Sequence, residues 1–159
     1  MLKIIFFGKN GSPRRHTLMK LISHRGNTQG RQKLLENHPN YISNTISQGF
    51  DAEVDVWVTD RLYLGHDEPQ YHCPMSFLVT NSDKLWIHCK NLKALETLNG
   101  IHCLNIFWHQ KDDYTLTSKG YVWTHPQKNV CEQSVLVVRD ATKYKGQRCH
   151  ALCSDTIVP

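Results

Sequence analysis

The chain has 159 residues, of which 40% are hydrophobic and 21% are charged, and its formal net charge at pH 7 is +5. This composition fits one soluble globular domain, and stable membrane insertion is excluded because no apolar run approaches the about 20 residues that cross a bilayer. The positive charge suits a polyanion, a membrane surface or a phosphorylated small molecule, but basic and aromatic residues do not interleave as in single-strand-binding surfaces, so no nucleic-acid partner is expected.

The first residues differ from the rest of the chain. Gly8–Arg15 is rich in glycine and polar residues, and a fresh start occurs at Met19. We expect residues 1–18 to be an N-terminal extension, upstream or non-native, and residues 19–159 to form one domain; the alternative is a genuine extra strand over Leu2–Phe7. The apolar run Ile4–Phe7 is too short for a signal peptide, so a cytoplasmic location is expected.

Short strands alternate with helices after the first strand, Lys20–Ser23, and the polar loop that follows it. Helices are predicted over Pro39–Gln48, which Gly49 ends, and over Leu92–Leu98. The further predicted strands are Ala52–Val58, Leu62–Gly65, Lys84–Lys90, Cys103–Phe107, Tyr121–Thr124, Ser134–Val138 and Ala151–Cys153. About eight strands would close a (β/α)8 barrel, which usually takes about 250 residues. The predicted fold is therefore α/β, an abbreviated TIM-barrel-like (β/α)8 with helices short or missing in the second half.

Two of these strands carry ionisable residues on one face. Alternation along residues 51–58 places Glu53 and Asp55 together, opposite an apolar face. Two neighbouring carboxylates repel unless a cation lies between them, which predicts a Mg²⁺ or Ca²⁺ site. In residues 85–90 the same alternation places His88 and Lys90 opposite an apolar face. An amphipathic strand with one face in solvent is the alternative for each.

Two histidines follow strands directly, in His24-Arg25-Gly26 and in His66-Asp67. The ends of barrel strands are where catalytic groups occur. Each histidine alone is only one of ten in the chain, but an acidic pair lies between the two in sequence. His24 and His66 are therefore candidate catalytic residues.

These motifs, in this order, resemble the glycerophosphodiester phosphodiesterase family of the phospholipase-C-like phosphodiesterase superfamily. The motifs are His24-Arg25-Gly26, Glu36-Asn37, Glu53-Val54-Asp55-Val56, Thr59 and His66-Asp67. Weaker resemblance continues at Lys90 and at Ser154-Asp155. The resemblance implies a TIM-barrel phosphodiesterase of lipid metabolism that hydrolyses glycerophosphodiester-type small molecules with a divalent metal, Mg²⁺ or Ca²⁺, through a cyclic phosphate.

The resemblance also implies a role for each matching residue. His24 and His66 would be the general acid and base, and Glu53 and Asp55 would bind the metal. The remaining roles are phosphate binding by Arg25 and Lys90, and support of the site by Glu36 and Asp67.

One departure from the family concerns the metal. His88 stands where the third metal ligand of the family is usually a glutamate. Histidine is softer and neutral, so the site loses one negative charge, which favours Mg²⁺ or a transition ion over Ca²⁺. We include His88 among the predicted metal ligands.

Other functions remain open alternatives. A related lipid phosphodiesterase of the phospholipase D type would show an exposed apolar patch near the barrel mouth. A non-catalytic module could keep the phosphate pocket, and a nucleic-acid-binding protein would bind DNA in a salt-dependent way. Trp108, His109 and Tyr121–Pro126 lie near predicted strand ends and either line the substrate pocket or pack in the core.

The six cysteines give no zinc-ribbon spacing. In a chain without an export signal, free thiols are expected, with one disulfide as the alternative. The sequence does not indicate an oligomeric state.

Overall fold

The computed structural model describes residues 19–159, so the predicted extension and the alternative strand within it lie outside the described residues. The described strands are β1 (Lys20–His24), β2 (Asp51–Val58), β3 (Leu62–Leu64), β4 (Tyr71–His72), β5 (Leu85–Cys89), β6 (Ile106–Phe107), β7 (Tyr114–Leu116), β8 (Val122–Thr124), β9 (Ser134–Val137) and β10 (Ala151–Ser154). The helices are α1 (Pro39–Ser47), α2 (Met75–Thr80), α3 (Leu92–Asn99) and a 3-10 turn, η1 (Ala141–Lys143). Within residues 19–159, no helix is long and apolar enough to cross a membrane.

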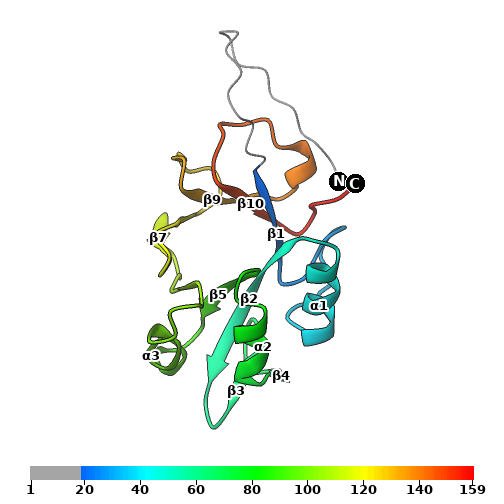
Figure 1. Ribbon diagram of the computed structural model, residues 1–159. Helices are drawn as coiled ribbons and strands as arrows, with labels where there is room; N and C mark the ends of the chain where they lie inside the picture. Colours follow the sequence, from blue (N-terminus) through cyan, green and yellow to red (C-terminus); the bar gives the residue numbers. More distant parts are fainter. Residues whose placement is uncertain (1–18) are drawn as a thin grey trace.

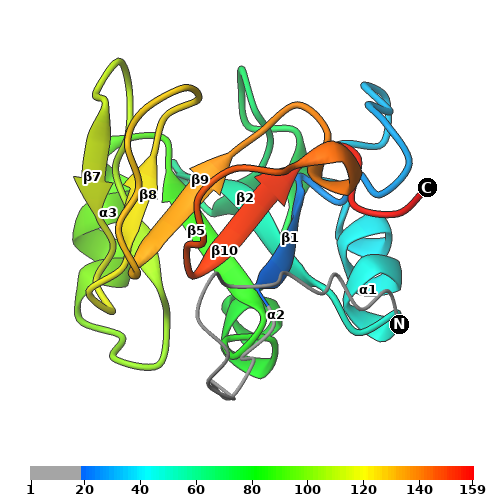
Figure 2. The same ribbon diagram turned by 90° about the horizontal axis from the view of Figure 1, so that it is seen from above.

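All of these strands belong to one curled, mixed sheet (Figures 1 and 2). Parallel pairings run from β6 through β5, β2, β1, β10 and β9 to β8. Strand β2 pairs with β5 along one edge, and along the other it pairs with β1 through residues 51–53 and with β3 through residues 56–58. The first and last strands are therefore neighbours, and the curl of the sheet gives it an inner and an outer face.

The predicted alternating (β/α)8 barrel is wrong. The described chain contains only three short α-helices, and β3, β4 and β7 run antiparallel to their neighbours. Strand β6 pairs only with β5 among the described strands, so the sheet is a partly closed half-barrel. Length is the physical reason: residues 125–133, which join β8 to β9, are fewer than the about twelve that a helical crossover needs.

The predicted elements themselves are largely confirmed. Every predicted strand and both predicted helices occur, with bounds that differ by a few residues at most. The sequence reading missed four short elements: β4, α2, β7 and η1. Strands of two or three residues carry too little periodicity to be recognised.

Local sequence explains where the two longer helices begin. Pro39 occupies the first turn of α1, where its missing N–H costs nothing, and the His38 side chain accepts a hydrogen bond from the Asn40 N–H. At α3 the Asn91 side chain accepts a hydrogen bond from the Ala94 N–H. Both helices pack on the outer face of the sheet (Figure 2).

The alternation along β2 decides which side chains enter the core and which enter the site. Ala52, Val54 and Val56 are fully buried in the outer core with the helices. Glu53 and Asp55 are also buried but lie on the inner face. The sequence prediction of one apolar and one acidic face is thus confirmed.

The structure contains six free cysteines, and their surroundings predict their reactivity. Burial raises the pKa of Cys73 and of Cys89 to about 12, whereas the hydrogen bond with Ser134 lowers the pKa of the exposed Cys131. Because the thiolate is the nucleophile, Cys131 is expected to reach its half-maximal alkylation rate at a lower pH than an ordinary thiol. Mass spectrometry after iodoacetamide treatment across a pH series measures this.

In the folded protein at neutral pH, only the exposed Cys103 and Cys131 are expected to be modified. Denaturant should then expose all six thiols. Rapid modification of Cys73 or Cys89 without denaturant would contradict this packing.

Candidate functional site

Ionisable side chains gather on the inner face of the sheet, near the C-terminal ends of β1 and β5 and in the middle of β2, which lies between them. His24 is the last residue of β1 and lies opposite Glu53 in the strand register. Asp55 lies opposite His88 on β5. Because β2 lies between β1 and β5, this register brings residues from three strands together in space.

These side chains line a cavity of about 360 Å³. Its ionisable lining residues are His24, Arg25, Glu53, His66, His88, Lys90, His109 and His125. A second cavity of about 260 Å³, between α3 and β7, has no ionisable side chain in its lining. The cavity with the histidines is therefore the candidate active site.

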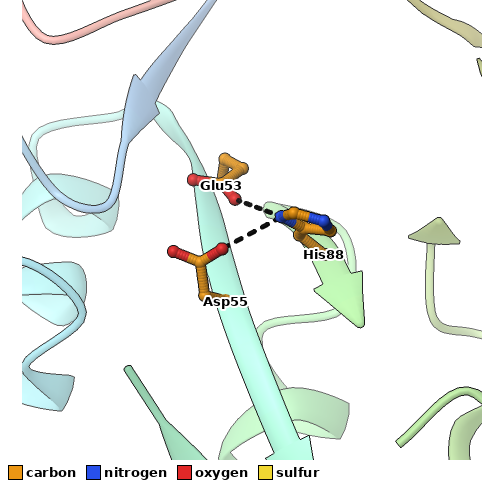
Figure 3. Close-up of side chains that lie close together, drawn as sticks. All are labelled: Glu53, Asp55 and His88. Carbon is orange, nitrogen blue, oxygen red and sulfur yellow. Dashed lines mark hydrogen bonds and ion pairs between the residues drawn. The ribbon is translucent and has the colours of Figure 1, made fainter. Parts of the chain in front are cut away.

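The predicted metal ligands form a compact cluster. One ligand atom from each of Glu53, Asp55 and His88 can be chosen so that all lie within 4.8 Å of one another. Figure 3 shows that the two carboxylates and the imidazole converge from β2 and β5. His88 Nδ1 lies 3.9 Å from Glu53 Oε1 and 3.0 Å from Asp55 Oδ1. Two carboxylates and one imidazole are a donor set that divalent ions use.

The other nitrogen of His88 supports this orientation. Nε2 lies 2.8 Å from the backbone carbonyl oxygen of His109, which can only accept, so Nε2 carries a proton and donates. A second hydrogen bond of this kind fixes the ring of most metal-binding histidines. His88 therefore presents Nδ1 to the carboxylates. Without a metal this nitrogen donates to Asp55, and a metal bound at Nδ1 would take the place of that proton.

Glu53 has a buried oxygen that accepts no hydrogen bond within residues 19–159. The residue is 2% exposed, and this oxygen is Oε2. Burial and the nearby charge of Asp55 raise the pKa of Glu53. A buried carboxylate oxygen left without a hydrogen bond is costly, and a bound cation would remove that cost. The cluster thus fits a divalent metal.

Asp55, by contrast, is surrounded by donors. They are Arg25 Nε (2.9 Å), Asn37 Nδ2 (2.9 Å), His88 Nδ1 (3.0 Å), His66 Nδ1 (3.2 Å) and Lys90 Nζ (3.5 Å). Burial would raise the pKa of Asp55, but the hydrogen bonds from His66 and His88 and the charge of Arg25 hold it well below its usual range. Asp55 therefore organises the site electrostatically as well as offering a metal ligand.

The candidate catalytic histidine His24 is oriented by Asp155. Its Nδ1 lies 2.8 Å from Asp155 Oδ1, and its Nε2 lies 3.9 Å from Glu53 Oε2. Burial would lower the pKa of His24, but the hydrogen bond to Asp155 and the charge of Glu53 outweigh it and raise the pKa. His24 is thus held with Nδ1–H toward Asp155.

His66 is held in a different way. Its Nδ1 lies 3.2 Å from Asp55 Oδ2, and its Nε2 lies 3.3 Å from Arg25 Nη2. Arginine only donates, so Nε2 accepts and Nδ1 carries the proton. Asp67 Oδ1 lies 3.5 Å from the same Nε2, but a carboxylate and an unprotonated nitrogen both accept, and the Asp67 side chain is 86% exposed, so Asp67 does not hold the ring.

The predicted supporting residue Glu36 fixes Arg25. Arg25 Nη1 donates to Glu36 Oε2 at 3.2 Å, and Glu36 Oε1 accepts from Asn27 and from Arg31 at 3.2 and 2.8 Å. Both Arg25 and Glu36 are buried. The guanidinium therefore lies in a fixed place between Glu36, Asp55 and His66.

Three site residues had no assigned role in the sequence. Asp155 orients His24, and Asn27 donates to Asp155 Oδ1 at 2.8 Å. Asn37 binds both the Asp55 carboxylate and the Asp55 N–H, each at 2.9 Å. Asn37 and Asp155 stood in motifs of the resemblance, so the signal existed, but their partners lie far away in sequence.

Gly26 is the third residue of the His24-Arg25-Gly26 motif, and its role is conformational. Its φ is +92°, and a Cβ there would lie 2.6 Å from Tyr41 Cδ1 on α1. Gly26→Ala is expected to destabilise the fold by about 1–3 kcal/mol, measured by urea unfolding. Gly100→Ala is the matched control, because nothing lies within 4 Å of its Cβ position. Equal stability of the two variants would contradict this account.

Aromatic and histidine side chains form the rest of the cavity wall. Of the segments expected near the pocket, His109, Trp123, His125 and Pro126 line the cavity. Trp108 instead packs against the outer core, and Tyr121 packs on His150. The pocket interpretation is thus correct for part of that set.

Comparison with known proteins does not assign the site. No protein family, characterised protein or solved structure was found to match the chain.

Proposed function

We propose that the chain is a metal-dependent phosphodiesterase that hydrolyses glycerophosphodiester-type small molecules. The observation that carries the proposal is that His24 and His66 face one cavity together with Arg25 and Lys90. An acid, a base and two fixed cations around one space suit a phosphodiester, which is anionic and needs proton transfer at two oxygens. The resemblance of the sequence motifs points to the same reaction.

The two histidines take different roles because they are held differently. His66 Nε2 carries no proton, so it can exchange its hydrogen bond from Arg25 for one from a substrate hydroxyl next to the phosphate. It then accepts the proton of that hydroxyl as the hydroxyl attacks phosphorus. His24, held by Asp155 and with a raised pKa, donates a proton from Nε2 to the departing alkoxide. The product is a cyclic phosphate, which water opens with the two histidines in exchanged roles.

Proton transfer alone is too weak for this bond. General acid–base catalysis gives about 10²–10⁴ in rate, and phosphodiester hydrolysis needs far more. Arg25 and Lys90 stabilise the charge that develops on the nonbridging oxygens. Mg²⁺ or Ca²⁺, when bound by Glu53, Asp55 and His88, would supply further charge stabilisation on the same oxygens.

The cellular setting is part of the proposal. We place the enzyme in the cytoplasm, with a small-molecule substrate as its partner. The six free cysteines support this location, since reducing compartments keep thiols free.

Hydrolysis of glycerol p-nitrophenyl phosphate, a chromogenic diester that keeps a hydroxyl next to the phosphate, tests the reaction with and without EDTA. Turnover is expected with Mg²⁺ or Ca²⁺ and is expected to be lost in EDTA. With glycerophosphocholine, phosphorus NMR should show a transient cyclic glycerol phosphate. Undiminished turnover in EDTA would overturn the metal requirement. Binding of glycerol phosphate without turnover in any metal would favour a non-catalytic phosphate-binding module.

One observation favours a second candidate, a lipid phosphodiesterase. An apolar patch near the cavity mouth is the feature expected of such an enzyme, and Leu34 and Leu35 are exposed directly before Glu36. Lysophosphatidylcholine and glycerophosphocholine share a headgroup and differ in the acyl chain. A kcat/KM that is higher for the lysolipid would select the lipid enzyme, and the reverse order would select the soluble-diester enzyme.

A further inference from the structure

A five-residue turn, residues 31–35, stands out of the fold beside the candidate active site. We call it the rim loop; it consists of Arg31, Gln32, Lys33, Leu34 and Leu35, all exposed. Leu34 is 88% exposed, and Leu35 is 45% exposed. The next two residues, Glu36 and Asn37, are buried and belong to the site.

The rim loop is fixed by hydrogen bonds through its backbone. The Leu35 N–H donates to the Gln32 carbonyl oxygen at 2.8 Å, and the Gln32 N–H donates to Asn27 Oδ1 at 3.0 Å. The Tyr71 hydroxyl donates to the Leu34 carbonyl oxygen at 3.2 Å. Two leucines are therefore held in solvent by an ordered turn, although neither is needed to fill the core.

The rim loop lies at the same edge of the sheet as the cavity. It follows β1 and precedes α1, and Figure 2 shows the segment before α1 at the edge where β9 and β10 end. Glu36 connects it to the cavity through Arg25. A surface that contacts the two leucines would therefore lie close to the cavity.

Basic side chains occur in the rim loop and in a neighbouring segment. Arg31 and Lys33 belong to the rim loop itself, and Lys143 (side chain 84% exposed) and Lys145 belong to the segment around η1. Residues 156–157 connect this segment to the chain just before the rim loop. The Ala141 N–H donates to the Thr156 carbonyl oxygen, and the Ile157 N–H donates to the Thr28 carbonyl oxygen. Arg31 pairs with Glu36 at 2.8 Å and Lys143 pairs with Asp140 at 3.0 Å. Within residues 19–159, Lys33 and Lys145 form no ion pair, so these two lysines carry the positive charge that is open to a ligand.

We infer that the rim loop docks the protein on an anionic lipid surface and sets the cavity against it. Apolar side chains at the tip of an ordered turn enter the region between headgroups and acyl chains, and basic side chains beside them contact anionic headgroups. A nucleic acid would use the charges but not the leucines. Two leucines on a short turn also make a small convex point, whereas protein interfaces need a broader surface.

Binding to lipid vesicles without turnover tests this inference independently of the proposed reaction. Wild-type protein is expected to sediment with phosphatidylcholine vesicles that contain phosphatidylserine, and to bind pure phosphatidylcholine vesicles much more weakly. Leu34→Ser is expected to lower the partition coefficient about tenfold or more. Lys33→Glu changes the charge by two units. Each unit is expected to lower the partition coefficient about fivefold, so the variant should bind about 25-fold more weakly.

Matched controls lie on the opposite side of the molecule. Leu116 on β7 is 70% exposed, and Lys119 follows it in an exposed turn. Figures 1 and 2 both show β7 and α1 on opposite sides. Leu116→Ser and Lys119→Glu are expected to bind vesicles like the wild type, and circular dichroism should confirm that all four variants fold.

Several results would overturn the inference. They are failure of the wild type to bind anionic vesicles, wild-type binding by Leu34→Ser, and equal losses in the control variants. Binding to a DNA duplex that Lys33→Glu abolishes and Leu34→Ser leaves unchanged, without vesicle binding, would assign the basic surface to nucleic acid instead.

Discussion

Replacing His24 with alanine is expected to lower kcat for phosphodiester hydrolysis by about 10²–10⁴-fold, the contribution of one general acid. The reason is geometric: His24 Nδ1 is held by Asp155 at 2.8 Å, which leaves Nε2 as the proton donor in the cavity. Steady-state kinetics on glycerol p-nitrophenyl phosphate and on glycerophosphocholine, which share the attacking glycerol and differ in the leaving group, measure the loss. Because p-nitrophenolate needs little help to leave, the loss should be larger for glycerophosphocholine.

His102→Ala is the matched control, since His102 is exposed and lies outside the cavity lining. It should leave kcat unchanged, and both variants should keep the wild-type unfolding midpoint to within a few degrees. Equal losses on the two substrates would mean that His24 does not protonate the leaving group. Full activity of His24→Ala on both would remove His24 from the reaction altogether.

The fold could be predicted strand by strand from sequence, but its closure could not. Alternation along residues 51–58 identified β2 correctly because one face carries valines and the other carries Glu53 and Asp55. The number of strands then suggested a barrel with helical crossovers. Strand count says nothing about pairing partners, and the connections from β6 to β9 are too short for helical crossovers.

The candidate site shows a similar division. Residues that share a strand face, such as Glu53 with Asp55, could be grouped from spacing alone. Asp155 could not be tied to His24 in this way, because 131 residues separate them and the contact depends on β10 pairing with β1. The sequence also could not show that Asp55 is surrounded by donors whereas Glu53 has an oxygen without a hydrogen bond, because these donors come from other elements.

Those environments predict that two isosteric substitutions on one strand will have opposite effects on stability. Asp55→Asn is expected to lower the free energy of unfolding by about 3–5 kcal/mol, the usual cost of removing one partner of a buried ion pair. Arg25 and Lys90 would lose a charged partner, and the new amide would direct N–H groups at existing donors. Urea unfolding at neutral pH measures the change.

Glu53→Gln is expected to keep or raise the free energy of unfolding in the absence of metal. Glu53 is buried with one oxygen that accepts no hydrogen bond in the described structure, and its pKa is raised. A carboxyl whose pKa is higher in the folded state favours folding less as pH rises through that pKa. The advantage of Glu53→Gln over the wild type should therefore be larger at neutral pH than in acid.

Metal should reverse the order of these two proteins. At a free metal concentration about 100-fold above Kd, a bound ion stabilises the fold by about 2.7 kcal/mol, and Glu53→Gln should gain little because it has lost a ligand. If Mg²⁺ or Ca²⁺ stabilises the wild type but not Glu53→Gln, then Glu53 binds the ion. Its charge would then lower the stability of the metal-free protein and raise that of the metal-bound protein. If instead Glu53→Gln is less stable than the wild type without metal, then the Glu53 charge serves to balance His24, Arg25 and His88, and the metal site loses its main support.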